Sequence, residues 1–250
     1  MADYKIGTDD PTITPDPGAG PWGSKSPSAE VIAEYTGITT ALGINVPMRF
    51  IPWVGTASDV SRQTIVVAIG DDAVKHMEHY FDNDGKDYTI DLEGMVHEVP
   101  SAGEVYKLEL SRAITFVQGL TPGTYDITSR KAVNGYNKQG ESKNWFFAIG
   151  GYSVWGKGKV TVTDKGSGKR EYVLEFEYKF FDRYNWDAGK SVTIPYINLR
   201  ITDHFMGEFH RCGLAKEFNT NGSIKRTIKW TSDAPPTITV DLGKISGGGR

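Results

Sequence analysis

The spacing of apolar residues predicts that the first half of the chain is mainly helical. Residues 28–43 carry apolar side chains at three- and four-residue intervals, and Gly43 suits a C-terminal cap. A second helix is predicted over residues 70–81, with acids in its first turn. A third is predicted over residues 101–119, opened by the capping box Ser-Ala-Gly-Glu. Between the first two helices, residues 64–69 are rich in isoleucine and valine and predict a short strand.

Beyond residue 123 polar and apolar positions alternate, which predicts strands. In residues 172–180 charged side chains alternate with tyrosine, leucine and phenylalanine, so one face of this strand is expected in the core. The other predicted strands are residues 145–149, 158–163, 191–194, 197–201, 223–230 and 237–242. Residues 164–168 predict a hairpin loop, and residues 204–212 predict a helix that Gly213 closes.

Together these patterns predict an α+β fold, with two to four helices packed on a predominantly antiparallel sheet or partly closed barrel in the C-terminal half. Residues 1–28 are rich in Pro, Gly, Asp, Ser and Thr, so a disordered leader or linker is expected, from which Trp22 could dock on the domain. A single domain is expected over residues 29–242, because no second linker-like stretch interrupts it. Residues 243–250 are expected to form a flexible tail.

Composition narrows the classes of function. The chain has 28 basic and 31 acidic residues, a net charge of -3 and no long run of either sign, which argues against nucleic acid as a partner. The single cysteine, Cys212, excludes an internal disulfide framework and a multi-cysteine zinc site. No apolar stretch approaches the ~18 residues of a membrane span. The N-terminus has neither a basic region nor an apolar signal core, so no transmembrane segment and no signal peptide are expected.

Two groups of polar residues in the first half of the chain have some features of metal sites, but neither is predicted to bind a metal ion. His76 and His79 share the helix over residues 70–81, but no third ligand lies nearby in sequence, so surface or partly packed histidines are predicted. Residues 82–93 match a calcium-binding loop at its first, third and twelfth positions. Lysine and aspartate stand where a ligand and a glycine are needed, so a turn leading into a strand is predicted instead.

The densest group of chemically active side chains lies in residues 180–190, where the long strand ends. Two acids, a tyrosine, an asparagine, a tryptophan and cations occur there, more polar groups than strand packing requires. Asp182 and Asp187 could hold a divalent cation such as Mg²⁺, because such cations take carboxylate ligands. His210, on the helix that follows, could act as a base or an acid near neutral pH.

Cleavage of a phosphodiester or pyrophosphate also needs cations around the phosphoryl oxygens. The candidates for this role are Arg183, Lys190 and Arg211. A purely structural alternative stays open, in which the acids shape the turn after the strand and Arg211 pairs with Glu208 or Glu217 on a solvated helix face.

The aromatic side chains near this box allow two functions. Tyr184 is expected at the edge of a catalytic pocket, with Trp186, Tyr152 and Trp155 as further contacts to a substrate. The same four rings could instead form the surface of a non-catalytic module that binds sugar, cell wall or a secretion-apparatus partner. Catalysis needs a concave pocket with convergent polar groups, whereas binding of this kind needs exposed rings.

Three runs of the chain resemble the C-terminal domains of secreted bacterial polymorphic toxins. They are residues 144–152, the box at residues 182–190, and the His-Arg helix with its continuation at residues 202–218. The likeness spans roughly residues 74–230 and attaches no reaction to them. It implies an antibacterial effector with an immunity protein and a component of the secretion apparatus as partners.

A second resemblance is to the colicin M family, which breaks the lipid-linked peptidoglycan precursor and carries an Asp-x-Tyr-Asp motif followed by His-Arg. Asp182, Tyr184, His210 and Arg211 match this motif by type. Asn185 replaces the second acid, and the spacer before the histidine is much longer than in the family. A later aspartate of the box could take the place of the missing acid.

The resulting hypothesis is a secreted effector that hydrolyses a phosphate-linked lipid precursor of peptidoglycan. Without a signal peptide of its own, such a chain would be delivered by a specialised apparatus and would act in the periplasm or envelope of a target cell; otherwise it would stay in the cytoplasm. The alternative is a binding or structural module of a bacterial secretion or injection apparatus that uses surface aromatics.

Overall fold

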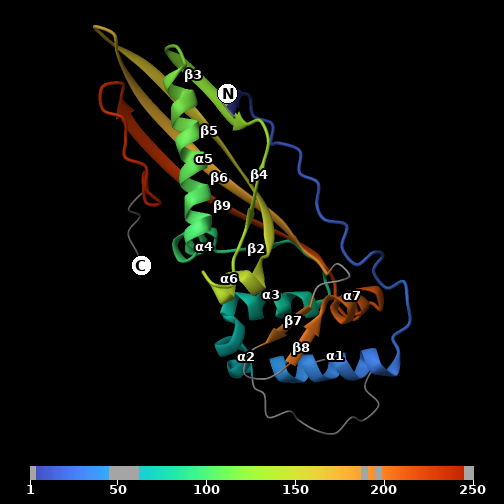
Figure 1. Ribbon diagram of the computed structural model, residues 1–250. Coiled ribbons are helices and arrows are strands. Elements are labelled where there is room, and N and C mark those ends of the chain that lie inside the picture. The colour runs from blue at the N-terminus through green and yellow to red at the C-terminus, as the bar shows by residue number, and fades with distance from the viewer. Residues whose placement is uncertain (1–3, 45–61, 187–190, 195–198, 245–250) are drawn as a thin grey trace.

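The architecture is a mostly antiparallel sheet with helices packed across it and gathered at one end (Figure 1). The computed structural model describes residues 4–44, 62–186, 191–194 and 199–244. The predicted α+β class is confirmed. The sheet is open, with β1 (Tyr4–Ile6) at one edge and β2 (Tyr88–Thr89) at the other, so the predicted alternative of a partly closed barrel is wrong.

Three long strands, β5, β6 and β9, form the centre of the sheet and pair antiparallel. The order is β1-β3-β5-β6-β9-β2, with β4 paired to β5 outside this path. The bounds are Gly123–Ser129 for β3, Val133–Tyr136 for β4, Gly151–Gly166 for β5, Lys169–Tyr184 for β6 and Phe218–Thr231 for β9. A separate two-stranded sheet consists of β7 (Ser191–Ile194) and β8 (Leu199–Thr202). The short β2 pairs parallel with β9 and so ties the first half of the chain to the second.

The described residues contain seven helices, more than the two to four predicted. They are α1 (Ala29–Leu42), α2 (Arg62–Ile69), α3 (Asp71–Asp82), α4 (Leu92–Glu98), α5 (Pro100–Gln118), α6 (Lys143–Ala148) and α7 (Asp203–Arg211). The long α5 lies across β5 and β6, while α1, α2, α3 and α7 gather at the opposite end (Figure 1).

The core lies between α5 and the inner face of the sheet and continues among α1, α2, α3 and α7. Along β6 the alternation predicted from sequence places Phe176, Tyr178 and Phe180 on this face, each at most 1% exposed. The Tyr106 ring of α5 meets the Tyr178 ring edge-on, with centroids 5.0 Å apart. Burial of each such side chain contributes roughly 1.5–3 kcal/mol, so this layer holds helix and sheet together.

Two segments predicted as strands are helices instead. Residues 64–69 lie in α2, where apolar side chains are buried at three- and four-residue spacing. Residues 145–149 largely form α6, which begins where the Trp145 N–H donates to the Ser142 hydroxyl at 3.2 Å. β-branched and aromatic residues favour strands only weakly, and packing of both segments on α3 decides their conformation.

Two further predictions differ in detail. The third predicted helix is α5, but it begins at Pro100, a residue whose backbone is pre-set for the first helical turn. Ser101 bonds through its hydroxyl and N–H to the Glu141 carboxylate, so the predicted capping box with Glu104 does not form. Residues 237–242, predicted as a strand, form irregular structure and turns over the core.

The N-terminal segment follows the domain along its whole described length. Residues 4–6 pair with β3, and residues 7–28, here named the N-terminal strap, run down one side of the molecule to α1 (Figure 1). Trp22 donates from Nε1 to the side-chain oxygen of Asn83 at 3.0 Å, which confirms that this ring docks on the domain.

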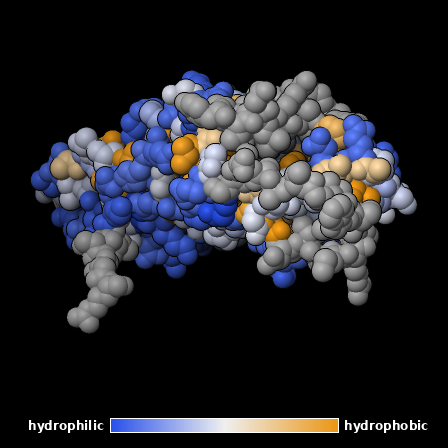
Figure 2. Space-filling view, turned by 90° about the horizontal axis from the view of Figure 1, so that it is seen from below, coloured by the Kyte–Doolittle hydropathy of each residue, from blue (hydrophilic) through white to orange (hydrophobic). Residues whose placement is uncertain are grey.

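The described surface is mostly hydrophilic on the face shown in Figure 2, with apolar residues in small groups. The exposed large apolar side chains are Ile6, Trp22, Val67, Leu108 and Tyr136, which lie far apart in sequence. Single exposures of this kind need no special role. Among the helices of the described ranges, none combines the length and the apolar character that crossing a membrane requires.

Candidate functional site

A polar cavity opens at the end of β6, beside Asp182. Its volume is about 200 Å³, and its walls come from β4, β5, β6 and the N-terminal strap. Asn134, Tyr152 and Ser153 line one side, and Thr14 and Asp16 of the strap line another. The cavity therefore joins residues from distant parts of the sequence around one carboxyl group.

The carboxyl of Asp182 titrates near neutral pH. Burial raises its pKa to about 7, and the nearby charge of Asp16 acts in the same direction. The Arg183 N–H donates to Asp182 Oδ1 at 2.8 Å and acts in the opposite direction. At neutral pH this group is therefore present both as an acid and as a base, as general acid–base chemistry requires.

Two of the predicted substrate contacts occupy different places. Tyr152 lines the cavity, and burial raises its pKa to about 12, so its hydroxyl keeps its proton. Trp155 lies further along β5, donates from Nε1 to Asp10 of the strap at 3.0 Å and lies under the Lys179 ammonium. The cavity lining does not include Trp155.

His210 is held by backbone groups on both sides of its ring. Its Nδ1 accepts a hydrogen bond from the Glu217 N–H at 3.1 Å, so the proton of the neutral ring is on Nε2. Nε2 donates to the Gly20 carbonyl of the strap at 3.0 Å. Burial lowers the pKa of this histidine, although the charge of Glu217 opposes that shift. In this arrangement His210 positions the strap, and both ring nitrogens are engaged.

Arg211 follows the structural alternative. Its Nε and one terminal nitrogen donate to Glu208, the latter at 2.8 Å, which confirms one of the two pairings open from sequence. The other terminal nitrogen donates to the Ala19 carbonyl of the strap at 2.9 Å. The guanidinium thus connects α7 to the strap.

The acid at the centre of this group is Glu217, which the sequence did not single out as a site residue. Its side chain is fully buried, and Oε1 accepts from the Ala19 N–H at 2.8 Å and the Trp186 N–H at 3.0 Å. Oε2 lies 3.5 Å from the Arg183 guanidinium. The sequence offered one signal for this role: Glu217 is an acid next to Phe218, close after Leu214 and Ala215, at the end of the toxin-like run over residues 202–218.

Tyr184 and Trp186 belong to an aromatic cluster. Tyr184 stacks on Phe218 with ring centroids 4.9 Å apart and meets Trp186 edge-on at 5.5 Å. The His76 ring lies 5.7 Å from Tyr184 and is 1% exposed, so His76 is more deeply packed than predicted. Its burial lowers its pKa to about 4. These rings pack around Tyr184, the last residue of β6.

The predicted residues therefore fall into two groups. Asp182 and Tyr152 line the cavity, whereas His210 and Arg211 bind the strap. Arg183 links the groups, because it lines the cavity and its guanidinium approaches the buried Glu217. Within the described ranges no hydrogen bond or ion pair joins Asp182 to His210. Two further predicted residues, Asp187 and Lys190, lie outside the described residues.

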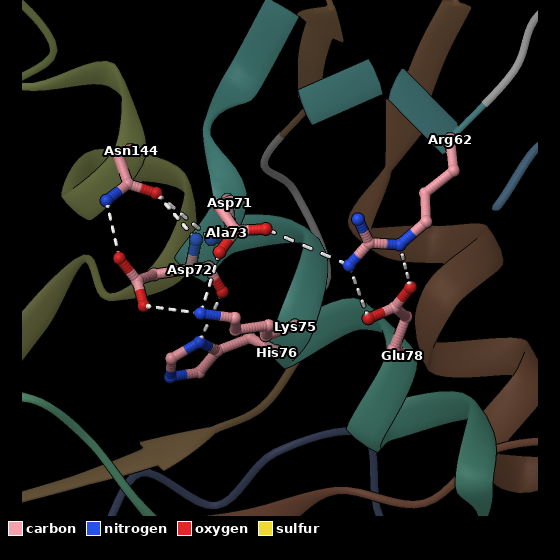
Figure 3. Close-up of polar contacts among 8 residues, drawn as sticks. All are labelled: Arg62, Asp71, Asp72, Ala73, Lys75, His76, Glu78 and Asn144. Atoms are coloured by element: carbon pink, nitrogen blue, oxygen red, sulfur yellow. Dashed lines mark hydrogen bonds and ion pairs between the residues drawn. The ribbon is translucent and has the colours of Figure 1, made fainter. Parts of the chain in front are cut away.

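The toxin-like run at residues 144–152 begins with a helix cap (Figure 3). Asn144 accepts through its side-chain oxygen from the N–H groups of Asp72, at 2.8 Å, and Ala73, and donates to the Asp72 carboxylate at 2.8 Å. A Cβ on Gly70 would lie 2.6 Å from the Asn144 Cα, so this contact needs glycine there. Asn144 thus joins α6 to the start of α3.

One group of side chains elsewhere has the composition of a metal site. Ligand atoms of Glu93, His97 and Asp241 lie within 4.8 Å of one another. Arg226 donates to both oxygens of Glu93, and Lys244 pairs with Glu93 at 3.0 Å and Asp241 at 3.7 Å. Cations of the chain already neutralise these carboxylates, which does not favour a bound metal ion.

The fold and cavity define an α+β protein with a titratable carboxyl at the end of its central strand. No family model and no curated protein match the chain. Solved structures do match. PaeM, a colicin M-like bacteriocin produced by Pseudomonas aeruginosa, aligns at 15% identity and a TM-score of 0.35 over 81% of this chain and 69% of that one.

Two other solved structures match over less of their length. The bacteriocin syringacin M from Pseudomonas syringae pv. tomato DC3000 aligns at 14% identity and a TM-score of 0.29, over 64% of this chain and 52% of that one. Pectocin M2 aligns at 14% identity and a TM-score of 0.25, over 64% and 51%. This chain spans about half the length of both, so its chemistry rests on its own residues.

Proposed function

We propose that this chain is a secreted antibacterial effector that hydrolyses a phosphate-linked lipid precursor of peptidoglycan. The observation that supports this most is the pKa of Asp182, about 7. This carboxyl lines a polar cavity beside Arg183. A carboxyl poised near the working pH is what a general base or acid needs. Delivery by a specialised apparatus, action in the periplasm or envelope, and an immunity protein as partner belong to the same proposal.

In this mechanism the Asp182 carboxylate takes a proton from a water molecule, whose oxygen forms a bond to phosphorus. The bond from phosphorus to the leaving oxygen breaks, and the proton on Asp182 passes to that oxygen. Arg183 neutralises charge on the phosphoryl oxygens when its guanidinium turns from Glu217 to the substrate. The protonated Tyr152 hydroxyl donates a hydrogen bond from the cavity wall.

A divalent cation such as Mg²⁺ fits the oxygen-rich lining of the cavity, where Asp182 and Asp16 are both present. Asp182 and Asp16 would hold it. Asp187, the second carboxylate predicted from sequence as a ligand, lies outside the described residues. With the cation bound, Asp182 would act as its ligand and no longer as the proton acceptor, and the cation would supply charge neutralisation at the phosphoryl group.

Expression in a bacterium tests the proposal. The chain is produced once in the cytoplasm and once with an added export signal, as wild type, Asp182→Asn and the control Asp126→Asn, which changes an exposed aspartate of β3. We expect growth arrest only on export, lost in Asp182→Asn and kept in Asp126→Asn. Harmlessness in both compartments would remove the toxin proposal, and arrest that survives Asp182→Asn would remove this cavity from it.

The alternative function, a non-catalytic module with surface aromatics, finds less support. Of its four rings, Tyr152, Trp155 and Tyr184 are 5%, 6% and 6% exposed, and Trp186 is partly buried. Rings buried to this extent offer little surface to a sugar or to a partner protein. If the exported chain does not arrest bacterial growth, this alternative becomes the better supported function.

A further inference from the structure

The N-terminal strap contacts both groups of predicted site residues, the cavity beside Asp182 and the polar side chains around Glu217. Its Ala19 binds Glu217 through the backbone N–H and Arg211 through the carbonyl, at 2.8 and 2.9 Å. Gly20 accepts from His210 at 3.0 Å. Three polar side chains of the site therefore find partners in two consecutive residues of the strap.

The strap continues beside α7 after this crossing. The Gly23 N–H donates to the His210 carbonyl at 3.1 Å, and the Lys25 N–H donates to the Arg211 carbonyl at 2.9 Å. The Lys25 ammonium also pairs with Glu208 at 3.1 Å. These bonds satisfy carbonyls at the C-terminal end of α7 and fix the path of the strap.

Upstream of the crossing, the strap forms part of the cavity wall. Residues 13–16 line the cavity together with Tyr152 and Asp182. The cavity between these walls is open to solvent on one side and has a volume of about 200 Å³. Pockets for drug-sized ligands have roughly 300–1,000 Å³, so movement of this wall would make room for a larger substrate beside Asp182.

The contacts that hold the strap near the site are mostly polar and can be exchanged for contacts to a substrate. Trp22, the large apolar side chain beside the crossing, is 48% exposed, so little apolar surface holds this part closed. Phosphate oxygens are better partners for Arg211 than the Ala19 carbonyl, because they carry charge and fit a guanidinium.

We propose that the strap is a lid, which covers one side of the Asp182 cavity at rest and is displaced when a phosphate-bearing substrate binds Arg211 and Arg183. The lid regulates the site assigned above and rests on that proposed function for its substrate. Its opening, however, can be measured without any activity. Glu217 keeps the strap in place, because its buried carboxylate accepts a hydrogen bond from the Ala19 N–H and also pairs with the guanidinium of Arg183.

A matched pair of glycines tests the lid. Gly18 and Gly23 both adopt left-handed backbone conformations, with φ of 71° and 64°, so alanine strains both equally. A Cβ on Gly18 would overlap the Glu217 carboxylate, whereas a Cβ on Gly23 meets nothing within 4 Å. Gly18→Ala should therefore release the strap, and Gly23→Ala should leave it closed.

Two chemical readouts follow the opening. The single thiol, Cys212, is only partly exposed and lies between the strap-bound Arg211 and Gly213, which the Trp22 ring approaches. Its labelling by a thiol reagent reports release of the strap. Modification of Asp182 by a carbodiimide, located by peptide mass spectrometry, reports access to the cavity.

We expect both reactions to be severalfold faster in Gly18→Ala than in wild type and unchanged in Gly23→Ala. Equal rates in the two variants, or faster labelling of Cys212 without faster modification of Asp182, would overturn the lid. If Gly18→Ala does not fold, Trp22→Ala, which removes an exposed docking residue, replaces it and should show the same order of rates. A lid that opens in a chain that never arrests growth would leave the lid standing and remove the proposed function.

Discussion

Asp182 makes the stability of the protein depend on pH. Its pKa in the folded state, about 7, lies above the ordinary value of 3.8. Between these values the folded state keeps a proton that the unfolded chain has lost, so the free energy of unfolding falls as the pH rises from about 4 to 7. Asp182→Asn, which cannot ionise, should lack this fall and be more stable than wild type at pH 8 by on the order of 4 kcal/mol. Urea denaturation of both proteins at pH 5 and pH 8 measures it, and equal pH dependence of the two would contradict it.

Glu217 should be among the most sensitive positions for stability. Glu217→Leu leaves the Ala19 and Trp186 N–H groups and the Arg183 guanidinium without their acceptor inside the protein. Removal of one partner from such a buried group costs about 3–5 kcal/mol. Thermal denaturation should show this loss, while Glu104→Leu on the exposed side of α5 should stay within about 0.5 kcal/mol of wild type.

At this scale the sequence indicated which residue types could act, but not which contacts they make. Asp182 could be singled out because an acid at the end of a long alternating strand is unusual. The engagement of His210 could not be foreseen, since its partner Gly20 lies 190 positions away in the chain. Burial also distinguishes Glu217 from the other acids, and burial is a property of the folded chain.

At the scale of elements, capping of α3 by a side chain of α6 gives the next prediction. Asn144→Ala removes an acceptor from two N–H groups in the first turn of α3. Loss of such a cap costs about 0.5–2 kcal/mol, so the melting temperature should fall by several degrees. Asn134→Ala, at the cavity edge and bonded to Ser153, is the comparison variant and should lose less. Equal losses would show that the Asn144 bonds add nothing to α3.

Elements with a long regular pattern were predictable, and so was the short β7, whereas the two short helices α2 and α6 were not. Residues 172–180 alternate over their full length, and β6 follows that alternation. The eight residues of α2 and the six of α6 are too short for their periodicity to outweigh β-branched and aromatic content. Their contacts with α3 come from sequence neighbours and from residues far along the chain, which a local pattern does not contain.

For the whole molecule, we expect the two halves of the chain to unfold together. Helix α5 of the first half packs on β5 and β6 of the second, and β2 pairs with β9. Cleavage between Gly119 and Gly123 should therefore not release two independently folded halves. Limited proteolysis followed by size-exclusion chromatography measures this, with cleavage in the Gly/Pro-rich strap as the internal comparison. Two separate compact fragments would contradict it.

The three residue pairs that join β1 to β3 also set a mechanical order. A force applied to the chain at Tyr4 first loads these pairs, then the strap, and only then α1 and the sheet. Traction on this end, of the kind a translocation machine exerts, would peel the strap from α7 while the central strands stay intact. Passage through a narrow channel would thus uncover Asp182 before it unravels the fold, and the strap would have to settle back into place on arrival.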